Sequence, residues 1–231
     1  EIAAKYAAET LKVKKVAVLY GTGDPYSSGV GKAFVAAAKQ AGLQVVAEEN
    51  SSSTDDTEYS SQLQKIEASG AEFLYAPYYY SAVGPYIVPQ ARSVGYDGYI
   101  MGPDGYDGLK TTGNKARYDK VLYTTHYSPD DKSNKKVQRF ITSYKAANNG
   151  ESPNTFTALG YDSVYMFKQA IEQAGEHATR TDIRNAIAGM NFSGVTGAFT
   201  LDKHGSPKKS VIVLEMKNGS PTYKDTIQPA E

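Results

Sequence analysis

Val16-Ala17-Val18-Leu19-Tyr20, followed by Gly21-Thr22-Gly23-Asp24-Pro25-Tyr26, decides the fold class of this chain. The first five residues are continuously apolar, which is typical of a strand buried on both faces of a parallel sheet. A Gly/Pro turn then leads into a helical pattern over 29–41, which Gly42 ends. A strand, a short connection and a helix form the first half of a βαβ unit, so this stretch predicts an α/β fold.

The same unit repeats along the first half of the chain. Alternating strands and helices with short connections predict a doubly wound parallel sheet, because right-handed crossovers place helices on both faces. Pro89 lies inside the last predicted helix of this part and should kink or shorten it. The further strands are predicted at 44–48, 73–76, 99–101 and 122–125, and the further helices at 58–69 and around 82–94.

The pattern changes after residue 125. Three helical stretches, at 134–147, 158–174 and 181–187, follow one another without a convincing strand between them. Closing strands are then predicted at 197–202, 210–216 and 222–226. We therefore expect one complete α/β lobe from 1–125 and 195–231, and the helical portion of a second, incomplete lobe from 126–194.

Composition argues against several functional classes. The 231 residues carry 25 Lys and Arg against 25 Asp and Glu, so no excess of positive charge favours nucleic acid. The sequence has no cysteine for a disulfide, a thiolate metal site or a nucleophile. His126, His177 and His204 lie far apart, and we predict no metal and no cofactor. The apolar runs are too short to span a bilayer.

Two phosphate-binding motifs fail in the same region. Tyr26 stands at the third glycine position of a dinucleotide fingerprint that would begin at Gly21. Gly31-Lys32 resembles a phosphate loop, yet Ala33 replaces the required Ser or Thr. The sequence also has no G-x-S-x-G elbow for a nucleophilic serine. We expect a protein that is not an enzyme, with a flavodoxin-like or hydrolase-like α/β enzyme as the alternative from another class.

Four residues are candidates for ligand binding. Asp104 leaves a carboxylate where the strand 99–101 runs into a Gly/Pro turn, and the carboxyl ends of such strands are where α/β proteins bind ligands. Tyr26 lies in the first strand-to-helix loop, Tyr80 closes a run of three tyrosines, and Tyr161 begins the long middle helix. Tyrosines around one acid predict capture of a small amine-bearing molecule. Asp104 could instead be a turn residue, and Tyr80 could pack on a loop.

Several short motifs occur in one order along nearly the whole chain. They are Ala3-Ala4-Lys5-Tyr6-Ala7 before Val16-Ala17-Val18-Leu19-Tyr20, then Tyr26-Ser27-Ser28-Gly29, Pro89-Gln90-Ala91-Arg92, Met101-Gly102-Pro103-Asp104-Gly105, Gly160-Tyr161-Asp162-Ser163 and Gly194-Val195-Thr196-Gly197. Together they resemble the type I periplasmic substrate-binding proteins of ABC importers, specifically the leucine/isoleucine/valine-binding group. Each lobe of that family resembles flavodoxin in its α/β architecture.

The resemblance implies two lobes around a cleft, with a hinge of crossing strands, that close on an amino acid. Asp104 then looks like the acid that takes the α-ammonium group of the ligand, where the family often has Glu. Tyr80 and Tyr26 would supply surrounding contacts, and Tyr161 would approach from the opposite lobe. The implied protein is the periplasmic or cell-surface solute-binding component of an ABC importer for a branched-chain or otherwise apolar amino acid. The runner-up is a ligand-sensing receptor domain of the same fold.

The chain departs from the family at its start. Family members begin with several βα units of the other lobe, which hold the ligand's carboxylate, and this sequence starts after them. We therefore expect the helices of 126–194 to expose apolar faces that a missing lobe or a second chain covers. The other expected partners are the amino-acid ligand and the membrane subunits of the transporter.

Overall fold

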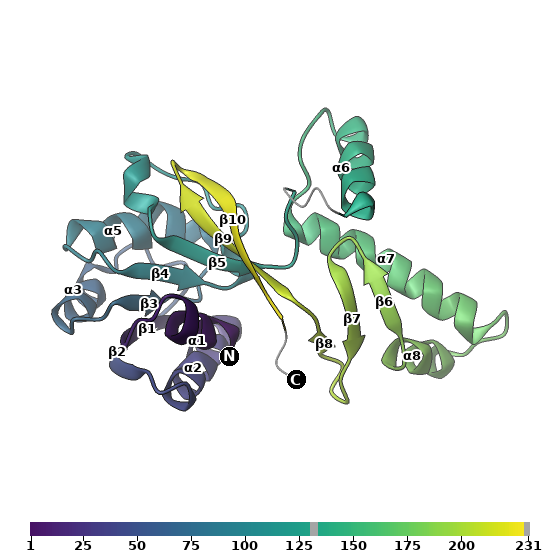
Figure 1. Cartoon of the computed structure of the whole chain (residues 1–231), viewed down its shortest axis with the longest axis horizontal. Coiled ribbons are helices and arrows are strands. Elements are labelled where there is room, and N and C mark those ends of the chain that lie inside the picture. The colour runs from purple at the N-terminus through teal and green to yellow at the C-terminus, as the bar shows by residue number, and fades with distance from the viewer. Residues whose placement is uncertain (130–133, 229–231) are drawn as a thin grey trace. The chain divides into compact units, whose positions relative to one another are not determined.

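The computed structural model describes residues 1–129 and 134–228 (Figure 1). Internal contacts divide the chain into two compact units. Unit 1 comprises Glu1–Thr124 and Val213–Asp225, and unit 2 comprises Thr125–Ile212 and Thr226–Glu231. Residues 195–212, which the sequence analysis expected in the complete lobe, have their contacts in unit 2.

Unit 1 is built on a seven-stranded sheet in the order β10-β9-β5-β4-β3-β1-β2. Neighbouring strands among β1 to β5 pair in parallel, so the predicted parallel α/β sheet is confirmed. Figure 1 shows these strands one above another, from β2 at the lower edge to β9 and β10 at the upper edge. Their bounds are β1 (Lys15–Gly21), β2 (Gln44–Ser51), β3 (Phe73–Tyr75), β4 (Tyr99–Gly102), β5 (Val121–Thr125), β9 (Val211–Lys217) and β10 (Ser220–Ile227).

The helices of unit 1 follow the predicted alternation. Contacts group α1 with α2 and α3 with α5, as expected when two helical layers cover opposite faces of the sheet. The bounds are α1 (Ile2–Lys5), η1 (Tyr6–Thr10), α2 (Pro25–Gln40), α3 (Ser60–Ala68), α4 (Tyr80–Ala82), η2 (Val83–Ile87), α5 (Val88–Ser93), η3 (Asp104–Tyr106) and η4 (Lys115–Tyr118).

Local chemistry explains where two of these helices differ from expectation. Helix α2 starts at Pro25 rather than at residue 29, because the Asp24 side chain accepts a hydrogen bond from the Ser27 N–H at 2.6 Å. The helix predicted around 82–94 is divided into α4, the π-turn η2 and α5, and Pro89 lies in the first turn of α5. Pro89 does not end the helical turns, which run from Tyr80 to Ser93 with the π-turn η2 directly before α5.

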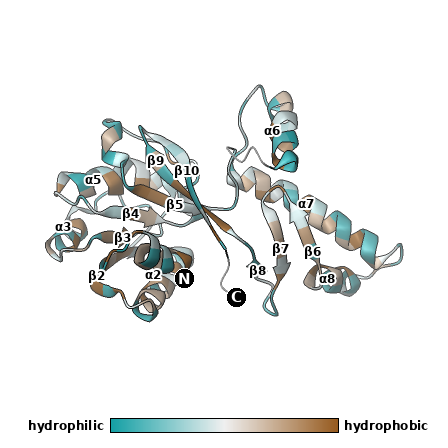
Figure 2. Ribbon diagram, viewed as in Figure 1, coloured by the Kyte–Doolittle hydropathy of each residue, from teal (hydrophilic) through white to brown (hydrophobic). Residues whose placement is uncertain are grey.

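The core of unit 1 explains the continuous apolar run that identified the fold. Strand β1 buries every residue after Lys15, because helices pack on both of its faces. Phe34 of α2 stacks on Tyr75 of β3 at 4.3 Å between ring centroids. Figure 2 shows hydrophobic residues along much of β5, another strand of this sheet. Burial of these strands, rather than local propensity, therefore specifies the sheet.

Unit 2 contains three helices and a small antiparallel sheet. The helices are α6 (Lys135–Ala147), α7 (Thr155–Ala174) and α8 (Arg180–Ala188), and the sheet has the order β6 (Asn191–Gly194), β7 (Gly197–Leu201) and β8 (Pro207–Lys208). All three predicted helices are present. Strand β6 was missed because its sequence, Asn-Phe-Ser-Gly, holds one apolar residue and therefore no periodicity. Strand β7 pairs with β6 and β8, whereas it was expected to close the sheet of the complete lobe.

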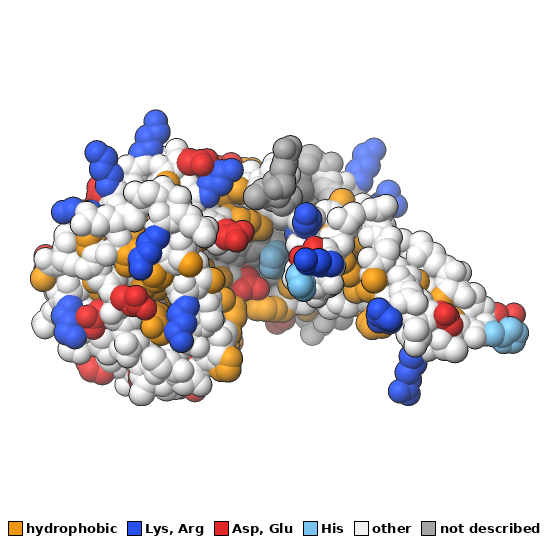
Figure 3. Space-filling view, turned by 90° about the horizontal axis from the view of Figure 1, so that it is seen from below, with side chains coloured by type: hydrophobic (Ala, Val, Ile, Leu, Met, Phe, Trp, Pro, Cys, Tyr) orange, Lys and Arg blue, Asp and Glu red, His pale blue; other side chains and the backbone are white. Residues whose placement is uncertain are grey.

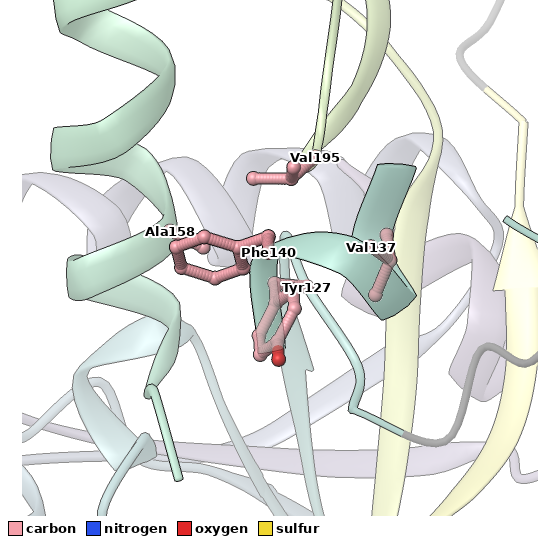
Figure 4. Packing of buried hydrophobic residues seen from close by; sticks show 5 residues of the cluster. All are labelled: Tyr127, Val137, Phe140, Ala158 and Val195. Carbon is pink, nitrogen blue, oxygen red and sulfur yellow. The ribbon is translucent and has the colours of Figure 1, made fainter. Parts of the chain in front are cut away.

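Two hydrophobic clusters hold unit 2 together. Figure 4 shows the first, in which Phe140 of α6 and Ala158 of α7 meet Tyr127 and Val195. The second cluster centres on Met190 and lies between α7, α8 and the small sheet. The opposite side of α7 stays exposed: the exposed fractions of Val164, Phe167 and Ile171 are 67%, 52% and 50%.

No helix in the described part of the chain is both long and apolar enough to cross a membrane. Figure 3 shows Lys and Arg side chains interspersed with Asp and Glu on the visible face, in keeping with the zero net charge of the sequence.

Candidate functional site

Asp104 and Tyr26 lie together in unit 1, at the carboxyl end of the parallel strands. Asp104 begins the short helix η3 that follows β4, and Tyr26 lies in the first turn of α2, which follows β1. The Tyr26 hydroxyl donates a hydrogen bond to Asp104 Oδ1 at 2.9 Å, and it accepts one from the Gly105 N–H at 3.2 Å. Both side chains are half-buried. Two residues 78 positions apart in sequence are therefore brought into direct contact by the strand ends.

Gly105 is required by this close approach. A Cβ atom at position 105 would lie 2.7 Å from the Tyr78 carbonyl oxygen and 3.1 Å from the Tyr26 hydroxyl. The Tyr78 ring is itself buried, and its hydroxyl shares a 2.8 Å hydrogen bond with that of Ser51. The backbone after β3 is thereby held against the turn that carries Asp104.

Tyr79 joins this pair, and the sequence analysis missed it. Its ring stacks on that of Tyr26, with centroids 5.3 Å apart and planes inclined by 23°. Its hydroxyl donates to Asp24 Oδ2 at 3.4 Å. The run of three tyrosines at 78–80 was the available signal, but spacing along the chain does not show which ring faces Tyr26.

Tyr80 and Tyr161 have other neighbours within their own units. Tyr80 begins α4 and is 50% exposed, and its ring lies near Gly108. Tyr161 belongs to unit 2, where its ring packs against Phe140 and Tyr165, each at 4.7 Å between centroids. It also lines a cavity of about 550 Å³ within that unit.

The electrostatics favour protonated phenols around a carboxylate. Burial raises the pKa of the Tyr26 hydroxyl, and the neighbouring Asp104 carboxylate raises it further. Burial is also the main cause that raises the pKa of Tyr79, with Asp24 as the next. Both hydroxyls therefore remain hydrogen-bond donors at neutral pH. A carboxylate that accepts from one of two stacked tyrosines is a suitable environment for an ammonium group, through charge-assisted hydrogen bonds.

Asp162 in unit 2 has a structural role that the motif Gly160-Tyr161-Asp162-Ser163 did not reveal. Its side chain is buried, with Oδ1 accepting from the Val195 N–H at 2.8 Å. Oδ2 accepts from both the N–H and the hydroxyl of Thr196, each at 2.7 Å. The carboxylate therefore fixes the connection between β6 and β7 to helix α7.

Metal binding has no support in the geometry. Within residues 1–129 and 134–228, no group of three or more His, Asp or Glu side chains is placed to hold a metal ion. His126 and His204 line one cavity of unit 2, but His177 does not.

Comparison with known proteins gives consistent matches. The Periplasmic binding protein family model matches residues 2–221. The leucine-, isoleucine-, valine-, threonine-, and alanine-binding protein of Pseudomonas aeruginosa is 27% identical over 209 residues, which cover 90% of this chain and 54% of that protein. The chain thus spans about half the length of the curated relatives it matches.

Two solved structures extend the match to the fold. A leucine-binding protein from Thermotoga maritima is 30% identical with a TM-score of 0.86, covering 99% of this chain and 64% of that one. A branched-chain amino acid transporter substrate-binding protein from Streptococcus pneumoniae, solved with isoleucine, is 27% identical with a TM-score of 0.82 and the same coverage. These relatives are binding proteins rather than enzymes, in agreement with the non-enzymatic function expected from the sequence. With its βα strand order and its family match over nearly the whole length, the chain belongs to the periplasmic binding protein family.

Proposed function

We propose that this chain is part of the solute-binding component of an ABC importer, and that its solute is a small apolar amino acid. Branched-chain amino acids such as leucine and isoleucine are the first to test. The observation that carries this proposal is the Tyr26–Asp104 hydrogen bond at the strand ends, with Tyr79 stacked beside it. Relatives named for leucine, isoleucine and valine binding support the choice of solute.

In the proposed site, Asp104 accepts the α-ammonium group of the amino acid. The Tyr26 hydroxyl, which already donates to Asp104, fixes the orientation of this carboxylate. The rings of Tyr26 and Tyr79 form an aromatic wall beside the charge. An ammonium–carboxylate pair becomes useful for affinity when further hydrogen bonds satisfy it and water is excluded.

Among the tyrosines after β3, we propose Tyr79 as the first contact in place of Tyr80. Tyr79 stacks on the residue that binds Asp104, whereas the Tyr80 ring is half exposed and lies near Gly108. Tyr79→Ala should therefore weaken amino-acid binding more than Tyr80→Ala. Equal effects of the two substitutions would contradict this assignment.

Closure of two lobes on the solute, with Tyr161 as a contact from the second lobe, stays a prediction from the family resemblance. Such closure requires that the ligand binds the closed state more tightly than the open one. Small-angle scattering with and without amino acid would report it as a decrease in the radius of gyration. An unchanged radius at saturating ligand would argue against closure.

We also propose that the exposed apolar row on α7 packs against a further βα lobe. Val164, Phe167 and Ile171 recur at helical spacing, and an apolar row of this kind is typical of a surface that packs against another element. The solved relatives are longer than this chain, since it covers 64% of each. That lobe would come from the remainder of a longer chain or from a second polypeptide.

The proposed place of action is outside the cytoplasm, in the periplasm or at the cell surface. Solute-binding proteins deliver their ligand to the membrane subunits of the importer, which are the further partners we propose. The name of the matched family supports the location, and the names of the relatives support the transport role.

The test is calorimetric titration with a panel of free amino acids. It compares this chain with the same chain joined to the βα lobe that the family resemblance places before residue 1. Leucine, isoleucine and valine should release heat with the joined protein, and lysine and glutamate should not. If the joined protein releases no heat with any amino acid at millimolar concentration, the proposal is overturned.

Asp104→Asn is the decisive variant of that experiment. Loss of the charged partner should weaken binding by about 10- to 100-fold, since a charge-assisted hydrogen bond contributes about 1.5–3 kcal/mol. Asp97→Asn is the matched control, because the Asp97 side chain is 89% exposed and forms an ion pair with Lys120 at the surface. Equal affinities for Asp104→Asn and the wild type would show that Asp104 is a turn residue.

A further inference from the structure

Lys209 in unit 2 is a buried cation that lies near the Asp162 carboxylate without forming an ion pair with it. The residue is 8% exposed, and no hydrogen bond or ion pair to its ammonium group is present within residues 1–129 and 134–228. Its nitrogen lies 5.7 Å from the centre of the Phe199 ring, which is a weak electrostatic contact. Lysine is almost never buried unless it is paired, because removing a charge from water costs much free energy. Lys209 therefore calls for an explanation.

The amine lines a cavity whose other walls are mainly apolar. The cavity has a volume of about 790 Å³, which is in the range of small-molecule sites, and lies entirely within unit 2. Helices α7 and α8 and strands β6 and β7 contribute its apolar side chains. These are Leu159, Met166, Ile187, Phe192, Phe199 and Leu201.

The charged groups around the cavity leave positive charge in excess. Asp162 is already held by the N–H groups of Val195 and Thr196. Asp202 accepts hydrogen bonds from the N–H groups of His204 and Ser206 at 2.8 and 2.9 Å. Both acids are thus hydrogen-bonded to the backbone, while the Lys209 amine has no hydrogen bond within residues 1–129 and 134–228. Besides Lys209, the titratable groups lining the cavity are His126, Asp162, Arg184, Asp202, Lys203 and His204.

We propose that this cavity binds an organic monocarboxylate with an apolar body, and that Lys209 is the group that holds its carboxylate. The apolar walls accommodate the body of the ligand, and its carboxylate forms the hydrogen-bonded ion pair that the Lys209 amine lacks. The lining residues of this cavity all belong to unit 2, whereas Tyr26 and Asp104 belong to unit 1. The cavity also differs in chemistry, because it selects an anion where Asp104 selects a cation.

The protonation of Lys209 supports this assignment. Burial lowers the pKa of Lys209 to about 8, and the nearby Asp162 carboxylate partly opposes that decrease. The amine is therefore charged below pH 8 and neutral above it, whereas ordinary lysines keep their charge up to about pH 10.4. A bound carboxylate favours the charged form, so ligand binding should raise the pKa of Lys209.

The experiment uses the full chain with its methionine methyl groups labelled with ¹³C. The sequence holds four methionines, of which Met166 lines the cavity and Met101 lies on β4 in unit 1. 3-Phenylpropionate is the probe, and 3-phenylpropan-1-ol is its neutral analogue. Titration of wild type at pH 7 should shift the Met166 signal and leave Met101 in place, and the alcohol should bind at least about tenfold more weakly.

Two substitutions and one pH series decide the role of the amine. Lys209→Met keeps the length of the side chain and should reduce the affinity for the acid to that for the alcohol. Lys208→Met, at the exposed neighbouring position, should leave the affinity unchanged. In wild type, the affinity for the acid should fall as the pH rises from 7 to above the Lys209 pKa of about 8.

The pH series needs no variant, so it decides the question even where Lys209→Met does not fold. Equal affinity for the acid and the alcohol would overturn the proposal. So would a Met166 signal that does not move with the acid at millimolar concentration, or an affinity that is constant between pH 7 and 10.

Discussion

Replacing Asp162 by Asn tests how firmly one buried carboxylate holds unit 2 together. Asp162 accepts three hydrogen bonds, from the Val195 N–H on Oδ1 and from the N–H and hydroxyl of Thr196 on Oδ2. Asn keeps one oxygen and replaces the other with an NH₂ group. A donor then faces a backbone N–H in a buried position, whichever way the amide is turned.

The magnitude follows from the number of bonds that are lost. One buried backbone N–H left without an acceptor costs about 1–3 kcal/mol, and the remaining bonds lose the strength that the charge gave them. We expect Asp162→Asn to destabilise unit 2 by about 2–4 kcal/mol. Because 1.4 kcal/mol corresponds to a factor of ten, exchange through opening of this unit should become about 30- to 700-fold faster.

The assay is amide hydrogen exchange by NMR at Val195 and Thr196. Asp202→Asn is the matched control, since Asp202 also accepts two backbone N–H groups, but at a solvated turn. Those N–H groups, with Ser206 first, lower the pKa of Asp202, so the control also removes a hydrogen-bonded charge. Asp202→Asn should accelerate hydrogen exchange much less at the amides that Asp202 holds, those of His204 and Ser206. If Asp162→Asn accelerates exchange no more than Asp202→Asn does, burial of the carboxylate is not what fixes the β6–β7 connection.

Three further predictions concern other parts of the chain. Burial gives Lys209 a lower pKa in the folded state than in the unfolded chain, so the free energy of unfolding of wild type should rise as the pH increases from about 8 to about 10.4. Urea unfolding at a series of pH values measures this rise, and Lys209→Met should abolish it. Gly194→Ala places a methyl group against the buried Asp162 carboxylate of α7 and should lower the free energy of unfolding by about 1–3 kcal/mol. In the same urea unfolding assay, Gly189→Ala should lower it clearly less, because its methyl group would lie at an ordinary 3.7 Å from the Asn185 carbonyl oxygen. Phe167→Gln should reduce self-association in analytical ultracentrifugation, because Phe167 belongs to the apolar row of α7. Tyr223→Gln is the control, since Tyr223 on β10 is equally exposed at 52%, and it should reduce self-association less. A larger effect of Tyr223→Gln than of Phe167→Gln would contradict the assigned surface.

The parallel sheet could be predicted from sequence because burial on both faces requires continuous apolar strands. Val16 to Leu19 are fully buried, and that requirement is visible in the residues themselves. Strand β6 could not be predicted in this way, since Phe192 is its one buried residue. Its place depends on pairing with β7 and on the Asp162 carboxylate, both of which are contacts distant in sequence.

The candidate site shows the same limit. The rule that strand ends meet at one edge correctly placed Asp104 beside Tyr26. Whether Tyr79 or Tyr80 contacts Tyr26 depends on the direction of the backbone between β3 and α4. A run of three adjacent tyrosines does not reveal that direction. Lys209 gave no signal in the sequence, because its neighbour Lys208 is exposed and the two look alike until burial is known.

The Asp162 contact also has a consequence for the order of folding. It joins residues 33 and 34 positions apart, so α8 and both its flanking turns lie inside the closed loop. The Asp162 contact closes this loop and takes up the conformational entropy of closure. The contacts that α8 makes inside the closed loop then lose less additional entropy when they form. We therefore expect residues 162–196 to behave as one cooperative folding segment, whose amides gain protection together during refolding.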